Sequence, residues 1–368
     1  MEKYEIAVDA RMINASGIGT YLQNILPAIC STYNTVLLGD RKELQPYKAD
    51  VIEFSAPIYS IKELATLPFK IPACKVFWSP HFNVPIIALP AKHVVTTIHD
   101  VFHLAFFNTL NSKQKVYAKF FYNHAAKQSD AIITVSNFSK QEISKYTSAK
   151  AEQIKVIYNG VHQNTFARAF SATEAEEINR KYALPQRYIL FVGNVKPHKN
   201  LITLIEALDA VLKKDENLFL VIVGKKDGFI TGDHQVGKLI EDSQLLKERT
   251  QFTGFAEQED LPFIYQRASL FVMPSLYEGF GLPPLEAMSA NTLTAVSDQA
   301  SLPEVCKNGA LYFNPYDKKA IRHVIEKALN LTTEEETELK RKASEVSQSY
   351  SWEKARQEHI KLFNEYIL

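Results

Sequence analysis

Hydrophobic and polar positions in the first part of the chain alternate between short apolar runs and helix-length segments. The apolar runs are rich in β-branched residues and end in polar turns, a pattern typical of strands. The expected strands are Tyr4–Val8, Thr35–Leu38, His93–Ile98 and Ala131–Val135. Strands that alternate with helices predict a parallel sheet covered by helices on both faces, as in α/β proteins.

The same alternation returns after residue 187. The expected strands here are Tyr188–Val192, Leu218–Val223, Thr250–Thr253, Leu270–Met273 and Leu293–Val296, and the expected helices are Leu201–Leu212, Val236–Glu248 and Trp352–Leu368. A simple turn is expected at Gly224–Gly228. The pattern therefore predicts two similar, Rossmann-like α/β domains.

The region between the two series predicts the domain boundary. Lys155–Val161 predicts a last short strand followed by a turn, and the polar segment 164–185 predicts an inter-domain connection. We therefore expect an N-terminal domain over residues 1–165 and a C-terminal domain over residues 166–351. Open α/β sheets bind ligands outside the carboxyl ends of their strands, so two domains facing a central cleft would place the chemistry there.

The composition is that of an ordinary globular protein. The 368 residues carry 42 Lys/Arg and 41 Asp/Glu, which argues against nucleic acid as a partner. The three cysteines, Cys30, Cys74 and Cys306, lack metal-ligand spacing and predict buried thiols in a reducing compartment. The start of the chain does not resemble a signal peptide and no run is apolar enough to span a membrane, which predicts a cytoplasmic protein.

The charge is nevertheless unevenly placed. Residues 1–165 hold 17 Lys/Arg against 12 Asp/Glu. A basic front half suits an anionic partner or a membrane surface, although chance would explain it equally well. The segment Tyr59 to Ala91 also mixes lysines with aromatic residues, which is typical of peripheral membrane contact or of an ordinary core with surface lysines.

The strongest candidate site is the segment Pro274–Met288, PSLYEGFGLPPLEAM. It predicts a strand, a glycine-containing loop and a helix whose first turn holds two prolines. The free N–H groups at such a helix start favour a phosphate, and two glutamates beside it suit the hydroxyls of a sugar and a ribose. A tight turn with solvated glutamates is the alternative. The residues that we expect to contact a donor here are Glu278, Gly279, Phe280, Gly281, Leu282 and Glu286.

This segment resembles the E-x7-E signature of the family 4 retaining glycosyltransferases, which have the two-domain GT-B fold. The resemblance covers most of residues 188–368, with the segments 191–200 and 253–261 similar to the family's phosphate loop and base-side loop. It implies that Glu278 contacts the donor sugar, that Glu286 contacts the ribose, and that Gly254 and Phe255 belong to the donor site. A GT-B fold also implies that the C-terminal helix 352–368 packs back on the N-terminal domain.

Lys199 is the predicted cation of the phosphate loop. It follows an expected strand and precedes an expected helix, where an ammonium group can neutralise a departing diphosphate. A lysine on the helix surface is the alternative. Asn194 occupies the position that is Arg in one common version of this loop, so Lys196 and His198 are candidates for the missing charge.

Two features of the N-terminal half complete the predicted site. Gly17 and Gly19 precede an expected helix, but Leu22 stands where a dinucleotide fingerprint needs glycine, so a plain turn is the alternative. The resemblance implies that this loop faces the donor diphosphate, and that His99, directly after a strand, hydrogen-bonds the donor sugar. His99, Asp100 and His103 could be imagined as metal ligands, but their spacing does not distinguish them from chance.

The resemblance implies a retaining hexosyltransferase with His99, Lys199 and Glu278 as catalytic residues and with no metal ion or other cofactor. The opening Val-Asp-Ala-Arg-Met is similar to bacterial mannosyltransferases of surface polysaccharides such as O-antigen. This favours GDP-mannose as donor, a glycan acceptor on a lipid carrier, and peripheral contact with the inner face of the plasma membrane.

Other functions remain open on the sequence alone. A UDP-sugar-dependent glucosyl-, galactosyl- or N-acetylhexosaminyltransferase would have the same motifs. A sugar-nucleotide epimerase or a phosphorylase could share the two-domain plan. A nucleotide-sugar-binding subunit without activity would not need His99, Lys199, Glu278 and Glu286 together.

Overall fold

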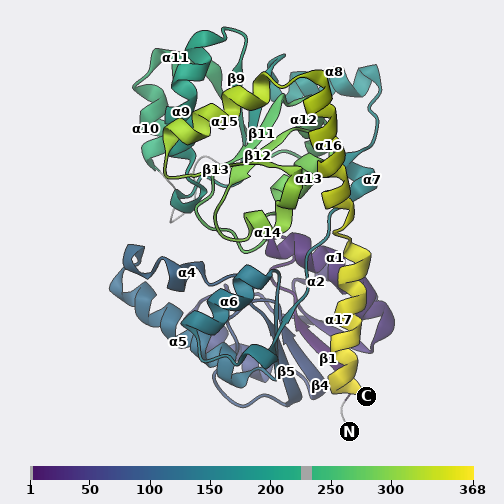
Figure 1. Cartoon of the computed structure of the whole chain (residues 1–368). Helices are drawn as coiled ribbons and strands as arrows, with labels where there is room; N and C mark the ends of the chain where they lie inside the picture. Colours follow the sequence, from purple (N-terminus) through teal and green to yellow (C-terminus); the bar gives the residue numbers. More distant parts are fainter. Residues whose placement is uncertain (1–2, 225–233) are drawn as a thin grey trace. The chain divides into compact units, whose positions relative to one another are not determined.

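The computed structural model describes residues 3–224 and 234–368, and the chain divides into two compact units. Unit 1 consists of residues 1–160 and 351–368, and unit 2 of residues 161–350 (Figure 1). The division comes slightly before the predicted one at residue 165, because the short helix α7 (Gln163–Phe166) packs against α12 and α13 of unit 2. Residues 225–228 of the predicted turn lie outside the described residues.

Unit 1 is built on a seven-stranded parallel sheet with the order β3-β2-β1-β4-β5-β6-β7. Its strands are β1 (Tyr4–Asp9), β2 (Thr35–Gly39), β3 (Asp50–Glu53), β4 (Cys74–Ser79), β5 (Ala91–Thr97), β6 (Ala131–Thr134) and β7 (Ile154–Val156). Its helices are α1 (Ile18–Thr32), α2 (Arg41–Leu44), α3 (Ile61–Thr66), α4 (Phe102–Ala105), α5 (Ser112–Gln128), α6 (Asn137–Tyr146) and α17 (Trp352–Ile367).

Unit 2 has a six-stranded parallel sheet with the order β10-β9-β8-β11-β12-β13. Its strands are β8 (Tyr188–Val192), β9 (Phe219–Val223), β10 (Thr250–Gly254), β11 (Leu270–Met273), β12 (Thr294–Ser297) and β13 (Leu311–Phe313). Its longer helices are α8 (Ala172–Tyr182), α9 (Leu201–Lys214), α10 (His234–Glu241), α11 (Gln244–Arg249), α12 (Leu261–Arg267), α13 (Leu282–Ser289), α15 (Lys318–Leu329) and α16 (Thr333–Gln348), and α14 (Leu302–Cys306) is short.

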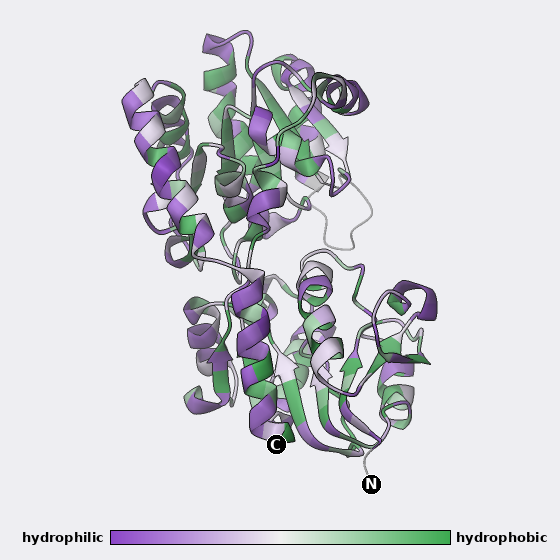
Figure 2. Ribbon diagram, turned by 90° about the vertical axis from the view of Figure 1, so that its right-hand side faces the viewer, coloured by the Kyte–Doolittle hydropathy of each residue, from purple (hydrophilic) through white to green (hydrophobic). Residues whose placement is uncertain are grey.

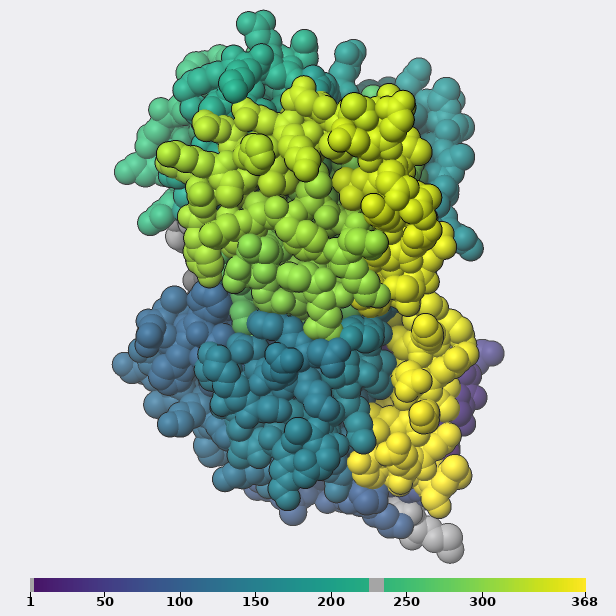
Figure 3. Space-filling view, in the orientation of Figure 1, coloured from purple at the N-terminus to yellow at the C-terminus, as the bar shows by residue number. Residues whose placement is uncertain are grey.

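Each sheet lies between two layers of helices, as predicted. In unit 2, α9, α10 and α15 lie on one side of the sheet and α13 and α16 on the other (Figure 1). The strands are the most hydrophobic parts of both units (Figure 2), and the core of unit 2 joins β8, β9 and β11 to α9 and α15. Helix α17 packs on α1 and β4 of unit 1, where its yellow atoms lie at the surface in Figure 3. The predicted return of the C-terminal helix to the N-terminal domain is confirmed.

Three strands were missed by the prediction, each for a local reason. The edge strand β3 is short and half exposed, and β13 has only three residues. Strand β4 runs through the basic and aromatic segment 59–91, where Phe77 and Trp78 are fully buried. These aromatic residues are therefore core residues and not part of a membrane surface.

The predicted helix Val236–Glu248 is wrong in one respect, since it is two helices. The chain leaves the helical path after Glu241, and the Ser243 side chain then caps α11 by accepting a hydrogen bond from the Leu246 N–H. Serine favours a new helix start over continuation because its oxygen satisfies a free amide there. The three cysteines are buried and free, as expected.

Candidate functional site

Lys199 and Glu278 form an ion pair at the carboxyl edge of the unit 2 sheet. Lys199 Nζ donates to Glu278 Oε1 over 2.6 Å, and the two side chains are only 17% and 12% exposed. Lys199 ends a 3₁₀ turn (Pro197–Lys199) directly before α9, and Glu278 lies in the loop between β11 and α13. The structure thus brings together the two residues that the sequence predicted to act on the donor.

The charge state of Glu278 is set by this pairing. Burial alone would raise the pKa of its carboxyl, but the positive charge of Lys199, with a smaller contribution from His198, holds the pKa below its ordinary value. The loop that carries Glu278 is fixed by the buried Ser301 hydroxyl, which donates to the backbone oxygens of Glu278 and Phe280, each over 2.9 Å. Glu278 is therefore an ionised carboxylate in a rigid position.

Glu286, eight residues after Glu278 and one turn into α13, has a different environment. Its Oε2 accepts a 2.8 Å hydrogen bond from the hydroxyl of Tyr265 on α12. Burial raises the pKa of Glu286 to about 7, and the hydrogen bond from Tyr265 offsets only part of that effect. Near neutral pH this carboxyl can either accept or donate a hydrogen bond, which suits contact with a hydroxyl group.

The start of α13 has the backbone conformation expected for a ligand-binding turn. Gly281 has φ 98°, and a Cβ there would lie 2.8 Å from Leu302 Cδ2. Leu282 begins the helix and its amide has no helical partner, whereas Pro283 and Pro284, the next two residues of the first turn, have no N–H. Gly279 is buried, and the ring of Phe280 packs edge-to-face against Tyr350 at 5.6 Å. Phe280 can therefore serve a donor only through its peptide group.

Three neighbouring strands of unit 2 end in glycine. Gly193 follows β8, Gly224 follows β9 and Gly254 ends β10. A Cβ at Gly224 would lie 2.1 Å from the Gly193 oxygen, while Gly224 N–H donates to the Gly254 oxygen over 2.8 Å. At Gly224 the backbones approach so closely that a side chain is excluded. Asn194 follows the first of these glycines.

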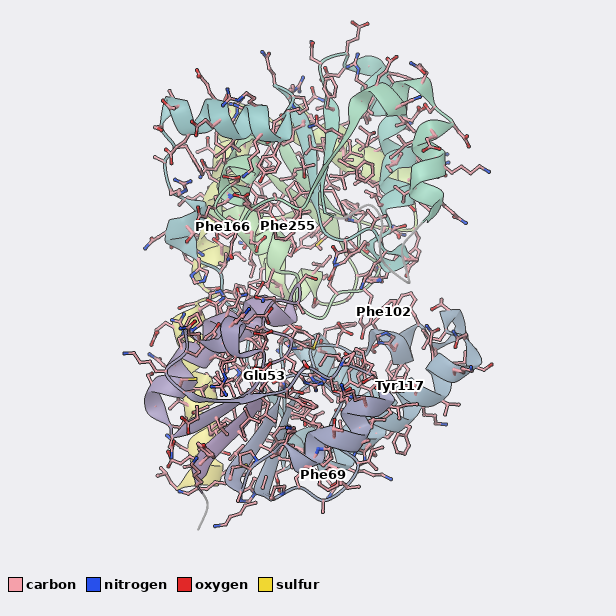
Figure 4. The ribbon with its side chains drawn as sticks, turned by 180° about the vertical axis from the view of Figure 1, so that it is seen from behind. Glu53, Phe69, Phe102, Tyr117, Phe166 and Phe255 are labelled. Atoms are coloured by element: carbon pink, nitrogen blue, oxygen red, sulfur yellow. The ribbon has the colours of Figure 1, made fainter. Side chains whose placement is uncertain are left out.

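The ring of Phe255 is 75% exposed directly after this glycine edge, and it is labelled in Figure 4. An exposed aromatic ring beside closely packed backbone offers a flat surface to a nucleobase. Sequence reasoning included Phe255 through the family resemblance, and the structure leaves its ring accessible to a ligand.

Asn200 is a structural residue of the site that sequence reasoning missed. It has a left-handed backbone, φ 57°, between the 3₁₀ turn and α9. Its Nδ2 donates to the oxygens of Pro274 and Pro315, over 3.1 and 2.8 Å. It therefore ties the Lys199 loop to the strand end before Glu278. The signal in the sequence was an asparagine at the first position before a helix, where left-handed conformations are common.

In unit 1 the predicted residues gather around the start of α1. Gly17 has φ 76° at the beginning of this helix, and a Cβ at Gly19 would lie 2.6 Å from the Ile13 oxygen. Tyr21, one turn further, packs edge-to-face on His99 with ring centres 4.9 Å apart. The glycine loop and His99 thus share the carboxyl edge of the unit 1 sheet.

His99 is neutral over the physiological range. Burial lowers its pKa to about 4, and Nε2 contacts the Pro80 oxygen over 3.1 Å. Because a carbonyl oxygen only accepts, Nε2 carries the proton and Nδ1 holds a lone pair. His99 can therefore accept a hydrogen bond from a ligand hydroxyl.

The imagined metal ligands His99, Asp100 and His103 do not form a ligand cluster in the structure. Among the described residues, the geometry of a three-ligand group is found at Asp9, Glu63 and His81. The guanidinium of Arg11 pairs with both of those carboxylates, at 2.5 Å from each. The cation that these carboxylates hold is therefore Arg11.

Comparison with known families covers both units. Residues 174–346, which include Lys199 and both glutamates, match the model of "Glycosyl transferases group 1", and residues 75–164, which include His99, match that of "Glycosyltransferase Family 4". The O-antigen chain mannosyltransferase B of Escherichia coli is 30% identical over 76% of this chain and 71% of its own length. The chain belongs to glycosyltransferase family 4.

Other relatives of this family 4 glycosyltransferase are similar over less of their length. The serotype-specific mannosyltransferase WbdA of Escherichia coli is 32% identical over 75% of this chain, but only 34% of WbdA is covered. The chain thus spans about a third of WbdA. It spans 64% of the O-antigen chain mannosyltransferase RfbU of Salmonella typhimurium, with 31% identity.

Solved structures confirm the GT-B fold. Sucrose-phosphate synthase from Thermosynechococcus elongatus superposes with a TM-score of 0.77 and 18% identity over 99% of both chains. Anabaena HepE in complex with UDP and glucose gives a TM-score of 0.76 and 17% identity, over 98% of this chain and 99% of HepE. Within the described residues, no helix combines the length and the apolar character needed to cross a bilayer.

Proposed function

We propose that this family 4 protein is a retaining mannosyltransferase that moves mannose from GDP-mannose to a hydroxyl group of a glycan acceptor. The Lys199–Glu278 pair, 2.6 Å apart and largely buried, carries the proposal. One residue of the pair has the charge needed by a departing diphosphate, and the other has the acceptor oxygens needed by sugar hydroxyls. Both are held in place before any ligand arrives, as transition-state stabilisation requires.

The diphosphate is bound by an ammonium group and backbone amides, without a metal ion. Lys199 stands directly before α9, and the first amides of α9 and the Leu282 amide at the start of α13 lack helical partners. The glycine edge of Gly193, Gly224 and Gly254 allows the phosphate oxygens to approach the backbone. Charge on the leaving group is thus neutralised by groups that belong to unit 2.

Glu278 orients the mannosyl ring, Glu286 accepts from the ribose hydroxyls, and His99 accepts from a sugar hydroxyl through Nδ1. Glu278 is paired with Lys199 and serves badly as a nucleophile, which favours a front-face reaction. The acceptor oxygen then forms its bond to the anomeric carbon on the side from which the phosphate leaves. Its proton passes to the departing phosphate oxygen, so the nucleoside diphosphate is released and the anomeric configuration is retained.

The choice of mannose rests on the relatives, since WbdA, RfbU and O-antigen chain mannosyltransferase B are named mannosyltransferases. A UDP-sugar is the second candidate, because HepE, with a similar fold, holds UDP and glucose. O-antigen relatives also support a glycan acceptor on a lipid carrier. Peripheral membrane contact is supported by α5, whose exposed Val116 and Phe120 lie among Lys113, Lys115 and Lys119.

Two measurements test this function. Thermal unfolding with GDP, UDP and ADP should show the largest stabilisation with GDP, about 2.7 kcal/mol at 100 times its dissociation constant. GDP-mannose with a mannose-terminated oligosaccharide should yield GDP and an α-mannosyl product, in the presence of EDTA. Stabilisation by UDP alone would identify a UDP-sugar as the donor in place of GDP-mannose. Donor binding without nucleotide release for any acceptor would make the chain a binding subunit, and a changed nucleotide sugar would make it an epimerase.

A further inference from the structure

Tyr59 has an unusual backbone and an exposed ring near the carboxyl edge of the unit 1 sheet. Its φ is 63°, a left-handed conformation that costs free energy in a residue with a bulky side chain. Nevertheless 45% of its surface is exposed. Strained residues persist where the surrounding structure holds them, and they cluster at ligand-binding sites.

The Tyr59 peptide is held by a fully buried carboxylate. Glu63 on α3 accepts from the Tyr59 N–H over 2.6 Å and from Asn83 Nδ2 over 2.6 Å, both at Oε2. Its other oxygen, Oε1, accepts from Arg11 over 2.5 Å. The Ser60 hydroxyl in turn caps α3 by accepting from the Glu63 N–H. Glu63 is therefore fixed by several partners and can impose the conformation of Tyr59.

Arg11 links this carboxylate to the end of β1. It donates to both oxygens of Asp9 and to the Ala56 oxygen, and its guanidinium lies 4.7 Å from the centre of the Phe54 ring. With one guanidinium for two carboxylates, the ion cluster is negative by one charge.

The hydrogen bonds of His81 indicate a neutral imidazole, so His81 does not offset that charge. The Asn83 N–H donates to its Nδ1, so Nδ1 is unprotonated and Nε2 carries the proton toward Asp9. The buried cluster therefore keeps a net negative charge close to the Tyr59 ring. An anionic ligand, such as a phosphate or an acidic lipid headgroup, is disfavoured there.

The Tyr59 ring is supported by other aromatic rings. It stacks on Phe82 with ring centres 5.4 Å apart and an interplanar angle of 17°. Phe82 stacks in turn on Tyr122 at 4.0 Å, and Tyr117 meets Tyr59 edge-on at 6.1 Å. Tyr117 is labelled in Figure 4, on the flank of unit 1 that carries α5. The exposed ring thus stands on a rigid aromatic base.

A carboxylate and His99 lie close to this platform. Asp100 follows β5 and accepts from the Phe102 N–H over 2.9 Å at Oδ1. Asp100 is near enough to act electrostatically on both Tyr59 and His99. Strands β1, β4 and β5 are neighbours in the sheet, so their carboxyl ends bring Asp9, His81 and His99 to one place.

We propose that Tyr59 is a stacking platform for a sugar ring of the acceptor, with the Asp100 carboxylate accepting hydrogen bonds from its hydroxyls. This inference rests on the proposed glycosyl transfer and deepens it by naming the acceptor contacts. A neutral sugar presents C–H groups to an aromatic face and hydroxyls to carboxylates, and its lack of charge is compatible with the negative cluster. Stacking supplies area while a few polar groups supply orientation, the usual division in ligand sites.

Saturation-transfer NMR on the full chain, without donor, tests the platform. The ligands are the methyl α-glycosides of mannose, glucose, galactose and N-acetylglucosamine. At least one should receive saturation, strongest at its ring C–H protons. The signal should fall at least fivefold in Tyr59→Ala and at least threefold in Asp100→Asn, and Tyr59→Phe should retain it. Phe69→Ala, which removes an 80% exposed ring elsewhere in unit 1, should leave the signal unchanged.

The outcomes separate this inference from the proposed function. Saturation of none of the four glycosides, or equal saturation in Tyr59→Ala, overturns the platform. The proposed GDP site is made of unit 2 residues, so the GDP affinity of Tyr59→Ala should stay within twofold of that of the unchanged protein. If no nucleotide binds and a glycoside still binds through Tyr59, the donor assignment fails while the platform stands.

Glu63 acts on the sugar only by positioning Tyr59, and the melting temperatures of Tyr59 variants report the backbone strain that it imposes. Tyr59→Gly relieves the free-energy cost of the left-handed backbone conformation, and Tyr59→Ala does not. The glycine variant should therefore melt a few degrees higher than the alanine variant, while both lose the saturation signal to the same extent. In Glu63→Gln one of the two accepting oxygens becomes an NH2 group that faces the donors Arg11, Asn83 or Tyr59 N–H, so the variant should weaken glycoside saturation at least threefold without a change in GDP affinity. A glycine variant that melts lower than the alanine variant contradicts the strain argument.

Discussion

The carboxyl edges of the two sheets differ in what they offer a ligand. In unit 2, Gly193 and Gly224 follow β8 and β9 and Gly254 ends β10, so the ends of these three strands offer backbone beside the Lys199–Glu278 pair. In unit 1, β1 ends at Asp9 and β5 leads into His99 and Asp100, so the edge carries charged and aromatic side chains. At these strand ends, two sheets of the same class thus differ in whether glycine backbone or side chains meet a ligand.

The difference separates two recognition problems. The diphosphate is the same in every nucleoside diphosphate sugar, and backbone amides with one lysine bind it without reference to the sugar. An acceptor differs from enzyme to enzyme, and side chains such as Tyr59 and Asp100 can be changed without altering the fold. We therefore expect substitutions in unit 2 to affect turnover or donor binding, and substitutions at the unit 1 edge to affect acceptor binding.

Lys199→Ala is the strongest test of the unit 2 edge. The variant removes the charge that meets the leaving group, so kcat should fall by about 10²- to 10³-fold. It is measured as GDP release from GDP-mannose. Lys213→Ala, exposed near the end of the helix α9 that follows Lys199, is the matched control and should keep full activity. Near-normal turnover in Lys199→Ala would mean that the backbone amides suffice.

Gly224→Ala and Gly254→Ala compare two glycines of the same edge. A Cβ at Gly224 meets the Gly193 oxygen at 2.1 Å, whereas a Cβ at Gly254 has no heavy atom within 4 Å, and both glycines have positive φ. The first change should cost about 2–3 kcal/mol of stability and weaken GDP binding, because the backbone must move. The second should cost about 1 kcal/mol, from φ alone.

Chemical denaturation and titration with GDP measure both effects. Equal losses in the two variants would show that the close approach of β8 and β9 is unimportant, and that the glycines are needed only for their dihedral angles.

The sequence predicted the unit 2 edge better than the unit 1 edge, for a physical reason. Glu278, Glu286 and the glycines lie in one short segment or directly after apolar strands, so local spacing places them. The Asp9–Arg11–Glu63 cluster joins the end of β1 and the turn after it to α3, which lies about 50 residues further along the chain, is short and was not predicted. Its members are charged residues that look solvent-exposed in sequence, and only the tertiary structure buries them.

Short strands were also missed by the sequence-based prediction. Strand β13 has three residues and β3 has four, too few for a period of two to stand out. Asn200 and Tyr265 support Lys199 and Glu286 through hydrogen bonds across the sheet edge, which no spacing in the sequence reveals.

Glu286 sharpens the comparison through pH. Its pKa, raised to about 7 by burial, means that the folded protein keeps a proton that the unfolded chain loses above about pH 4.5. Stability from this group is therefore highest at low pH and declines as pH rises to about 7. Ribose hydroxyls donate stronger hydrogen bonds to the ionised form of Glu286 than to the protonated form. GDP affinity should therefore rise up to about tenfold from pH 6 to pH 8. Calorimetric titration at several pH values measures this.

Glu286→Gln is the control for that profile. The amide cannot titrate, so GDP affinity should become flat with pH and the variant should be the more stable at pH 8. A profile that keeps its slope in Glu286→Gln assigns the titration to another group.

The smallest expected effect is on the pH dependence of stability, through a buried histidine in the interior of unit 1. His359 on α17 contacts the Tyr21 hydroxyl at 2.5 Å, and burial lowers its pKa to about 4. The unfolded chain takes up a proton near pH 6.5 and the folded protein does not, so stability is full above pH 6.5 and is lost as pH falls toward 4. Each such histidine contributes a slope of up to about 1.4 kcal/mol per pH unit in that window.

Both tryptophans, Trp78 and Trp352, lie in unit 1, so urea unfolding followed by fluorescence reports on this unit. His359→Gln should remove about half of the slope between pH 5 and pH 6, because His99, with its pKa also lowered to about 4, still titrates. GDP affinity should not change. An unchanged slope would mean that His359 is already protonated in the folded protein, and that the contact with Tyr21 holds an imidazolium instead of a neutral ring.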